Sequence, residues 1–179
     1  MTRLLYLIFF LSGATGLVYE VLWVRLTGLV FGNTSFSIAT VLGAFMTGLA
    51  LGSWVLGALA DRYDRPLRMY GVLEILIGVS ALLVPMAFRS VDQLYWSLAP
   101  SLDFLVGADL WVHFLASFAI MVVPTFLMGG TLPVLSRFFV RSTNDVEAKL
   151  GTLYALNIFG AALGTLGAAL ILIPGFGSQ

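Results

Sequence analysis

Residues Gly43 to Gly78 read GAFMTGLALGSWVLGALADRYDRPLRMYGVLEILIG, and this stretch decides how the rest of the chain folds. Two apolar runs flank a short polar segment, Asp61 to Arg68, which carries five charged side chains. This pattern suits a lipid bilayer, because two helices can cross the membrane while the charges between them stay in water. The stretch therefore predicts a pair of transmembrane helices.

The composition of the whole chain also indicates a membrane protein. Of its 179 residues, 60% are hydrophobic and 10% are charged, whereas soluble domains carry about 25% charged residues. Nine basic and nine acidic residues cancel, so no nucleic-acid partner is indicated. There is no cysteine and only one histidine, so we expect no Cys-based or His-rich metal site and no cofactor.

Five apolar runs predict an all-α fold, a polytopic transmembrane helical bundle of about five spans. We expect a single transmembrane domain over residues 1–179 and no soluble catalytic domain. The segment Arg89–Asp109 is expected to be an external loop with room for an interfacial helix. A cleaved signal peptide is rejected, because the first apolar run continues to Phe31. The expected helices are residues 4–31, 36–60, 67–88, 110–140 and 150–173.

The basic residues predict the orientation of these helices. With the N-terminus inside, Arg89 falls outside and Arg25 lies near the end of the first helix. The remaining basic residues then fall in inner segments: Arg3, Arg62, Arg65, Arg68, Arg137, Arg141 and Lys149. By the positive-inside rule, we expect a multi-pass protein of the cell (inner) membrane with a cytoplasmic N-terminus.

Three polar side chains, Glu20, Glu74 and Asn157, fall inside the predicted helices. Each shares a helical face with small residues, and such faces allow helices to approach closely. We therefore expect all three to face the interior of the bundle. The stripes are Gly13, Gly16, Glu20, Trp23 and Thr27; Gly71, Glu74, Gly78, Ala81 and Pro85; and Asn157, Gly160, Gly164 and Gly167.

Two interpretations of these polar groups remain open. They either form hydrogen bonds that only fix helix packing, or they bind a proton, cation or substrate, since an intramembrane charge costs roughly 3 kcal/mol. Arg25 joins Glu20, Glu74 and Asn157 as a candidate binding residue, although it lies about 140° around the helix from Glu20. His113 is expected to be an ordinary interfacial histidine.

The fourth apolar run contains Pro124, Gly129, Gly130 and Pro133 within ten residues. This density of prolines and glycines predicts a bend or a break in the helix. Broken helices expose backbone groups that transporters use to hold ions and substrates, but a passive kink is an equally good interpretation. The GxxxG motif at 48–52 and another at 28–32 predict close helix packing.

Two resemblances add to these inferences. The segment GALADRYDR, residues 57–65, resembles the loop signature between the second and third helices of major facilitator superfamily transporters, except that the family usually has glycine in place of Asp64. Four longer blocks resemble the membrane region of spermidine-synthase-like proteins, in which facilitator-like helices are fused to an aminopropyltransferase domain. The blocks begin at Ser12, Phe45, Pro124 and Gly151.

The resemblances imply a half-facilitator-like fold and assign a gating role to Asp61, Arg62 and Arg65. Because no glycine-rich nucleotide-binding loop follows a strand, we expect the aminopropyltransferase domain to be absent and the chain not to be an enzyme. We expect a half-transporter that moves or binds a cationic, polyamine-like solute. The alternative is an accessory structural or anchoring subunit of a larger membrane complex. The expected partners are the lipid bilayer and a second copy of the chain or a second membrane protein.

Overall fold

The computed structural model describes residues 2–32, 34–102, 108–142 and 146–176 and is helical almost throughout. The helices are α1 (Thr2–Phe31), α2 (Thr34–Arg62), α3 (Pro66–Leu102), α4 (Ala108–Ser142) and α5 (Val146–Gly167), followed by the π-helix η1 (Ala168–Leu172) and α6 (Ile173–Phe176). In the described ranges, five helical segments of 26 to 30 residues are long and apolar enough to span a membrane. The predicted all-α fold with five potential spans is confirmed.

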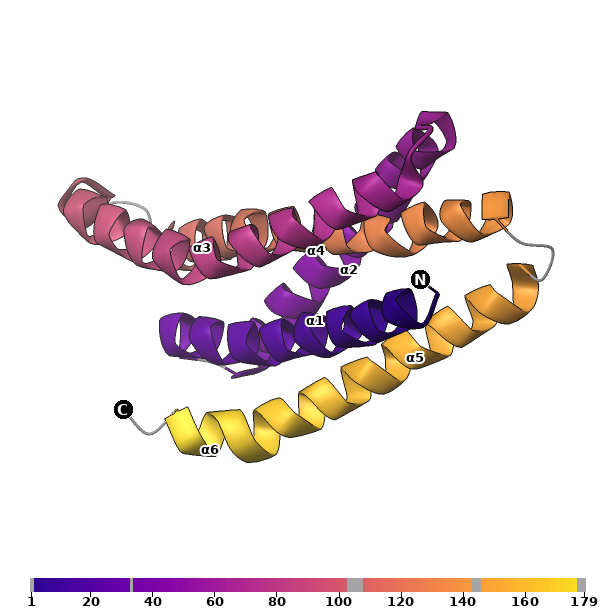
Figure 1. Cartoon of the computed structure of the whole chain (residues 1–179). Helices are drawn as coiled ribbons and strands as arrows, with labels where there is room; N and C mark the ends of the chain where they lie inside the picture. The colour runs from indigo at the N-terminus through magenta and orange to yellow at the C-terminus, as the bar shows by residue number, and fades with distance from the viewer. Residues whose placement is uncertain (1, 33, 103–107, 143–145, 177–179) are drawn as a thin grey trace.

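The helices alternate in direction and lie side by side as packed pairs. The main partners are α2 with α4, α1 with α5, and α3 with α4. Figure 1 shows α1 and α5 as one layer and α3 and α4 as another, with α2 crossing behind them. The start of α1, the α2–α3 connection, the end of α4 and the start of α5 all lie at the right-hand end of this view. We call this end, which gathers most of the basic segments, the N-terminal end.

Glycines, which have no side chain, allow the backbones of α2 and α4 to come into contact. A Cβ atom at Gly52 would overlap the carbonyl oxygen of Phe126, and one at Gly129 would overlap that of Leu49. At Gly48, a Cβ atom would overlap the hydroxyl of Thr125. The GxxxG motif at 48–52 therefore serves close helix packing, as its spacing predicts.

The fourth helix was predicted to bend or to break; no break is found, and the bend stays a prediction. The α4 helix continues from Ala108 to Ser142 with Pro124 and Pro133 inside it. Gly129 and Gly130 serve packing instead, since a Cβ atom at Gly130 would overlap the side chain of Leu56. Prolines are tolerated inside membrane helices where neighbouring helices hold the backbone in place, and α4 packs against both α2 and α3.

The α5 helix lies against α1 along the stripe of small residues that the sequence predicts. Cβ atoms at Gly160 and Gly164 would overlap the carbonyl oxygens of Phe10 and Ala14. The side-chain amide of Asn157 donates a hydrogen bond of 3.0 Å to the carbonyl oxygen of Phe9. Gly167, the last residue of the predicted stripe, takes no part in this close approach, because a Cβ atom there would meet nothing within 4 Å.

The segment Arg89–Asp109, expected to be an external loop with room for an interfacial helix, is helical for most of its length. Residues 89–102 continue α3 as helix, and residues 103–107 lie outside the described ranges. The apolar part of α3 ends at Val91, close to the predicted end of the span. Loss of hydrophobicity marks where a helix leaves the membrane and does not by itself end the helix.

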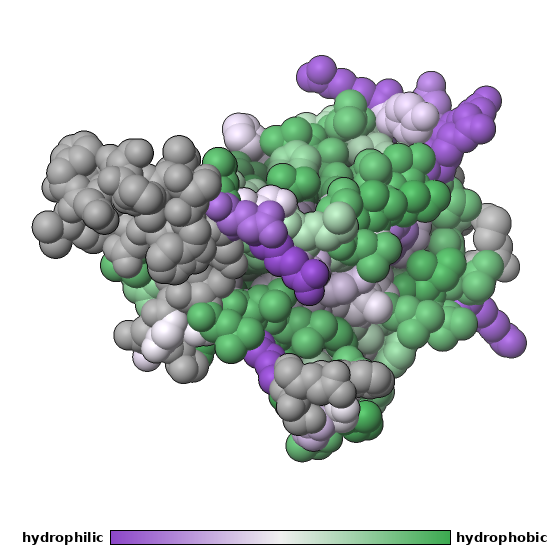
Figure 2. All heavy atoms as spheres, turned by 90° about the vertical axis from the view of Figure 1, so that its left-hand side faces the viewer, coloured by the Kyte–Doolittle hydropathy of each residue, from purple (hydrophilic) through white to green (hydrophobic). Residues whose placement is uncertain are grey.

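Buried apolar side chains form two clusters. The N-terminal cluster is Leu5, Phe9, Leu56, Ala60, Tyr70, Leu73, Val134, Leu135, Phe139 and Leu153. The distal cluster is Trp23, Val41, Ala44, Phe45, Val84, Phe88 and Met121. Much of the remaining apolar surface is exposed, as at Leu29 and Leu82, which are 78% and 76% exposed. Figure 2, which views the end of the bundle opposite the N-terminal end, shows apolar residues over much of this face and hydrophilic side chains projecting at its margins.

Candidate functional site

Glu74 of α3 lies beside the N-terminal cluster, with one carboxylate oxygen, Oε1, buried. Tyr70, one helical turn earlier, is a member of that cluster and is 3% exposed. The side chains of Tyr70 and of Ser12 from α1 are the polar groups that interact with the Glu74 carboxylate. Neither Tyr70 Oη nor Glu74 Oε1 completes a hydrogen bond. The site therefore joins α1 and α3 through three polar side chains.

The helical repeat explains how α3 contributes to this site. Residues four apart project from the same side of a helix, so Tyr70 and Glu74 are neighbours. The buried stripe of α3 consists of Tyr70, Leu73, Ile77, Ala81, Val84 and Phe88. The small-residue stripe predicted around Glu74 is not the packing face, because Cβ atoms at Gly71 and Gly78 would meet nothing within 4 Å. Large side chains form the α3 contact, and Glu74 lies at the margin of that contact.

The other predicted binding residues lie at separate positions. Glu20 is partly buried on α1, between Gly16, which lies near Met128, and the buried Trp23. No hydrogen bond or electrostatic interaction joins Glu20 to Glu74. Arg25 is partly buried further along α1. Asn157 packs against Gly13, the neighbour of Ser12, so Asn157 and Glu74 contact adjacent positions of α1.

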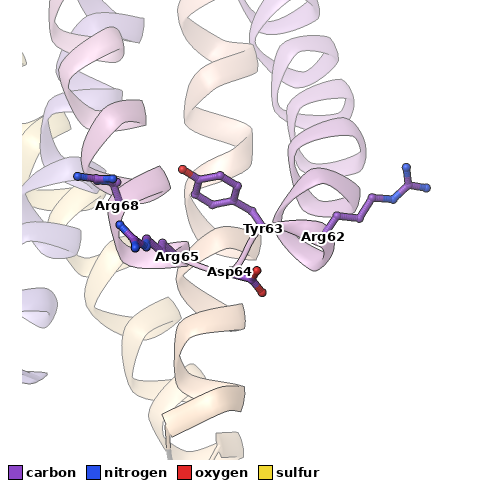
Figure 3. A pocket seen from close by; sticks show the side chains of 5 residues that line it. All are labelled: Arg62, Tyr63, Asp64, Arg65 and Arg68. Carbon is purple, nitrogen blue, oxygen red and sulfur yellow. The ribbon is translucent and has the colours of Figure 1, made fainter.

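The polar connection between α2 and α3 forms a second candidate site at the N-terminal end. Arg62, Tyr63, Asp64, Arg65 and Arg68 line a shallow pocket of about 270 Å³. In Figure 3, Arg62 points away from the hairpin, while Arg65 and Arg68 lie on the opposite side of Tyr63. The Asp61 side chain forms an ion pair with Arg137 of α4, at 3.7 Å between Nε and Oδ1. Of the three predicted gating residues, only Asp61 takes part in this link to another helix.

Sequence reasoning missed Tyr70, Ser12 and Arg137. Tyr70 could have been found from its position four residues before Glu74. Ser12 and Arg137 lie far from Glu74 and Asp61 in the sequence, so only the arrangement of the helices brings these pairs together.

The Glu74 site brings together one carboxylate and the hydroxyl groups of Tyr70 and Ser12. A carboxylate and two hydroxyl groups provide oxygen acceptors for a donor-rich group. In the described ranges, no group of three or more His, Cys, Asp or Glu side chains is placed to hold a metal ion.

Comparison with known proteins gives relatives but no matching family model or solved structure. The chain is 28% identical over 179 residues to polyamine aminopropyltransferase 1 of Streptomyces coelicolor, covering 97% of this chain and 30% of the relative. It is 25% identical over 174 residues to polyamine aminopropyltransferase 2 of Ralstonia nicotianae, covering 97% and 31%. A polyamine aminopropyltransferase of Corynebacterium efficiens is 27% identical over 176 residues, covering 93% and 30%. The chain thus spans about a third of the length of the curated relatives it matches.

These relatives correct one expectation from the sequence. We expected a chain that is not an enzyme, but four curated relatives named polyamine aminopropyltransferase point to an enzyme. The lack of a recognisable catalytic motif in these 179 residues does not exclude an enzyme. The resemblance to spermidine-synthase-like proteins is supported by the names of the relatives.

Proposed function

We propose that this chain is the membrane unit of a polyamine-handling protein and that its helices bind a cationic, polyamine-like solute. The observation that carries the proposal is the match to polyamine aminopropyltransferases over 93% to 97% of the chain. Polyamines are cations at neutral pH, because aliphatic amines are protonated there. Carboxylates within the apolar bundle, at Glu20 and Glu74, have the charge to hold such a solute.

In this proposal the chain works as a half-transporter with a facilitator-like arrangement. A half needs a second half to enclose a path, so a second copy of the chain or a second membrane protein completes it. The N-terminal end faces the cytoplasm, following the positive-inside rule. Asp61 acts there in gating through its ion pair with Arg137, and Arg62 and Arg65 contribute charge to the same loop.

A second candidate function is membrane anchoring of an aminopropyl-transfer activity. It is favoured by the relatives, because the matched region makes up only 30% or 31% of their length. In this case the polar side chains fix helix packing, and the helices keep the transferase at the membrane where its polyamine product is released.

Accumulation of radiolabelled spermidine by cells that express the chain, against an empty-vector control, tests the first proposal. Saturable accumulation above the control supports transport, and accumulation equal to the control contradicts it. The mass and composition of the complex purified in mild detergent from its native membrane tests the alternative. A homodimer or a pair with a second helical protein supports the half-transporter, whereas co-purification with aminopropyltransferase activity and no spermidine accumulation supports the anchor.

A further inference from the structure

A buried phenol, Tyr70, and a partly buried carboxylate, Glu74, lie next to each other on α3 with incomplete hydrogen bonding. Tyr70 is 3% exposed, and neither its Oη nor Oε1 of Glu74 has a hydrogen-bond partner. Buried polar atoms are nearly always paired with protein, water, an ion or a ligand. Tyr70 and Ser12 lie close enough to interact with the Glu74 carboxylate, yet Tyr70 Oη and Glu74 Oε1 keep hydrogen-bonding capacity that a bound group can use.

The chain itself does not neutralise this carboxylate. The side chains that interact with Glu74 are Tyr70 and Ser12, both neutral. No lysine, arginine or histidine in the described ranges forms an ion pair with Glu74. An unpaired charge away from water is costly, so a cation that enters the site gains a charge-assisted hydrogen bond.

We propose that Glu74, Tyr70 and Ser12 form a binding site for a primary ammonium group, of the kind that ends a polyamine. A primary ammonium has three N–H donors, and the site offers three oxygen acceptors: the Glu74 carboxylate, the Tyr70 phenol and the Ser12 hydroxyl. The inference rests on the proposed function, because it names the atoms that would hold the polyamine-like solute.

The apolar side of the site suits the methylene chain behind an ammonium. The ring of Phe9 in α1 lies against that of Tyr70, with centroids 6.4 Å apart and planes tilted by 59°. Aromatic rings next to a bound ammonium contribute a cation–π attraction, and they also pack against methylene groups. Phe9 and Ser12 are three residues apart on α1, so the same face of that helix supplies a polar and an aromatic contact.

A metal ion fits these residues poorly. Calcium takes six to eight oxygen ligands and zinc takes nitrogen or sulfur ligands with carboxylates. The site has one carboxylate, and no group of three His, Cys, Asp or Glu side chains in the described ranges could complete such a set. Two hydroxyl groups and a single carboxylate are better suited to accept hydrogen bonds from an ammonium group than to coordinate a bare divalent ion.

Equilibrium binding of radiolabelled spermidine to the detergent-purified chain, with n-butylamine as a competitor carrying a single ammonium, tests the inference. Glu74→Gln removes the charge at constant size and is expected to weaken binding by about 10- to 100-fold. Tyr70→Phe and Ser12→Ala each remove one neutral acceptor and are expected to weaken it by about 3- to 10-fold. Matched controls on the exposed surface of α5, Glu147→Gln and Tyr154→Phe, are expected to bind as the wild type does.

The possible outcomes separate the inference from the function on which it rests. Loss of binding in the three site variants, with competition by n-butylamine and unchanged circular dichroism, supports the site. Spermidine binding that survives in Glu74→Gln and Tyr70→Phe overturns the site and leaves the proposed function in place, because the solute then binds elsewhere. Absence of spermidine binding by the wild type overturns both.

Discussion

Arg137 of α4 reaches the end of α2, where its Nε lies 3.7 Å from Oδ1 of Asp61 and its Nη2 donates a hydrogen bond of 3.3 Å to the Asp61 carbonyl oxygen. The Asp61 side chain is 71% exposed, so solvent screens the ion pair and its contribution to stability is small. The link joins α2 to α4 at the N-terminal end of the bundle, and the gating role of Asp61 stays a proposal.

Asp61→Asn tests whether this contact has a role beyond stability. The substitution removes the charge and keeps the size, so the melting temperature should fall only slightly, in line with a surface ion pair worth about 0 to 1 kcal/mol. Spermidine uptake should fall by a larger factor. The exposed Glu147→Gln on α5 is the control for loss of one carboxylate at the same end. Equal loss of uptake and of stability in Asp61→Asn would assign the residue a purely structural role.

Alanine at Gly52 and at Gly78 should have opposite effects on stability. At Gly52 the added Cβ overlaps the backbone of Phe126, so α2 and α4 must separate, at a cost of about 1 to 3 kcal/mol. At Gly78 the Cβ meets nothing within 4 Å, and alanine favours the helix by up to about 1 kcal/mol. Unfolding in detergent by heat or by sodium dodecyl sulfate measures both. A tolerated Gly52→Ala would contradict the close contact between α2 and α4.

Asn157→Ala should loosen the pairing of α1 with α5. It removes the hydrogen bond from the side-chain amide to the carbonyl oxygen of Phe9, and such bonds between membrane helices contribute about 0.6 kcal/mol, with a maximum near 1.7. Thr152→Ala on the exposed face of α5 is the control, since its hydroxyl bonds only within its own helix. The same unfolding assay applies, and an equal effect in both variants would argue against an interhelical role for Asn157.

The orientation can be tested with single cysteines, because the sequence contains none. Tyr63→Cys and Glu147→Cys lie at the N-terminal end, and Ser35→Cys lies at the start of α2 at the opposite end. With a cytoplasmic N-terminus, a membrane-impermeant maleimide should label position 35 in intact cells and positions 63 and 147 only after lysis. The reverse pattern would invert the orientation, and labelling of all three in intact cells would contradict the transmembrane arrangement.

Much of the fold could be predicted from hydropathy and small-residue spacing. The runs around 36–60 and 150–173 are helical, and the face of α5 that carries Asn157 and Gly160 packs on α1. These features could be predicted because each depends on residues within one helix. The continuation of α3 to Leu102 and the intact α4 could not. The continuation of α3 and the intact α4 both depend on what surrounds the helix, which the sequence of that helix alone does not reveal.

The candidate site could be predicted only in part. Glu74 stands out because a carboxylate within an apolar run is costly. Its partner Ser12 becomes visible only when α1 and α3 are placed together. The small-residue rule misplaced the packing face of α3, because there the larger Leu73, Ile77 and Val84 fill the contact. Glu20 remains a predicted binding residue.

Uptake of radiolabelled spermidine into proteoliposomes tests the central claim most directly, with wild type, Glu20→Gln and Glu74→Gln compared at equal amounts of folded protein. The proposal predicts saturable uptake by the wild type and loss of most of it in Glu74→Gln, with Glu20→Gln also impaired, because each substitution removes a carboxylate from the bundle. Empty liposomes set the background. Wild-type uptake no greater than this background, or uptake unchanged in both variants, would contradict the proposal that these helices carry a polyamine-like cation on their carboxylates.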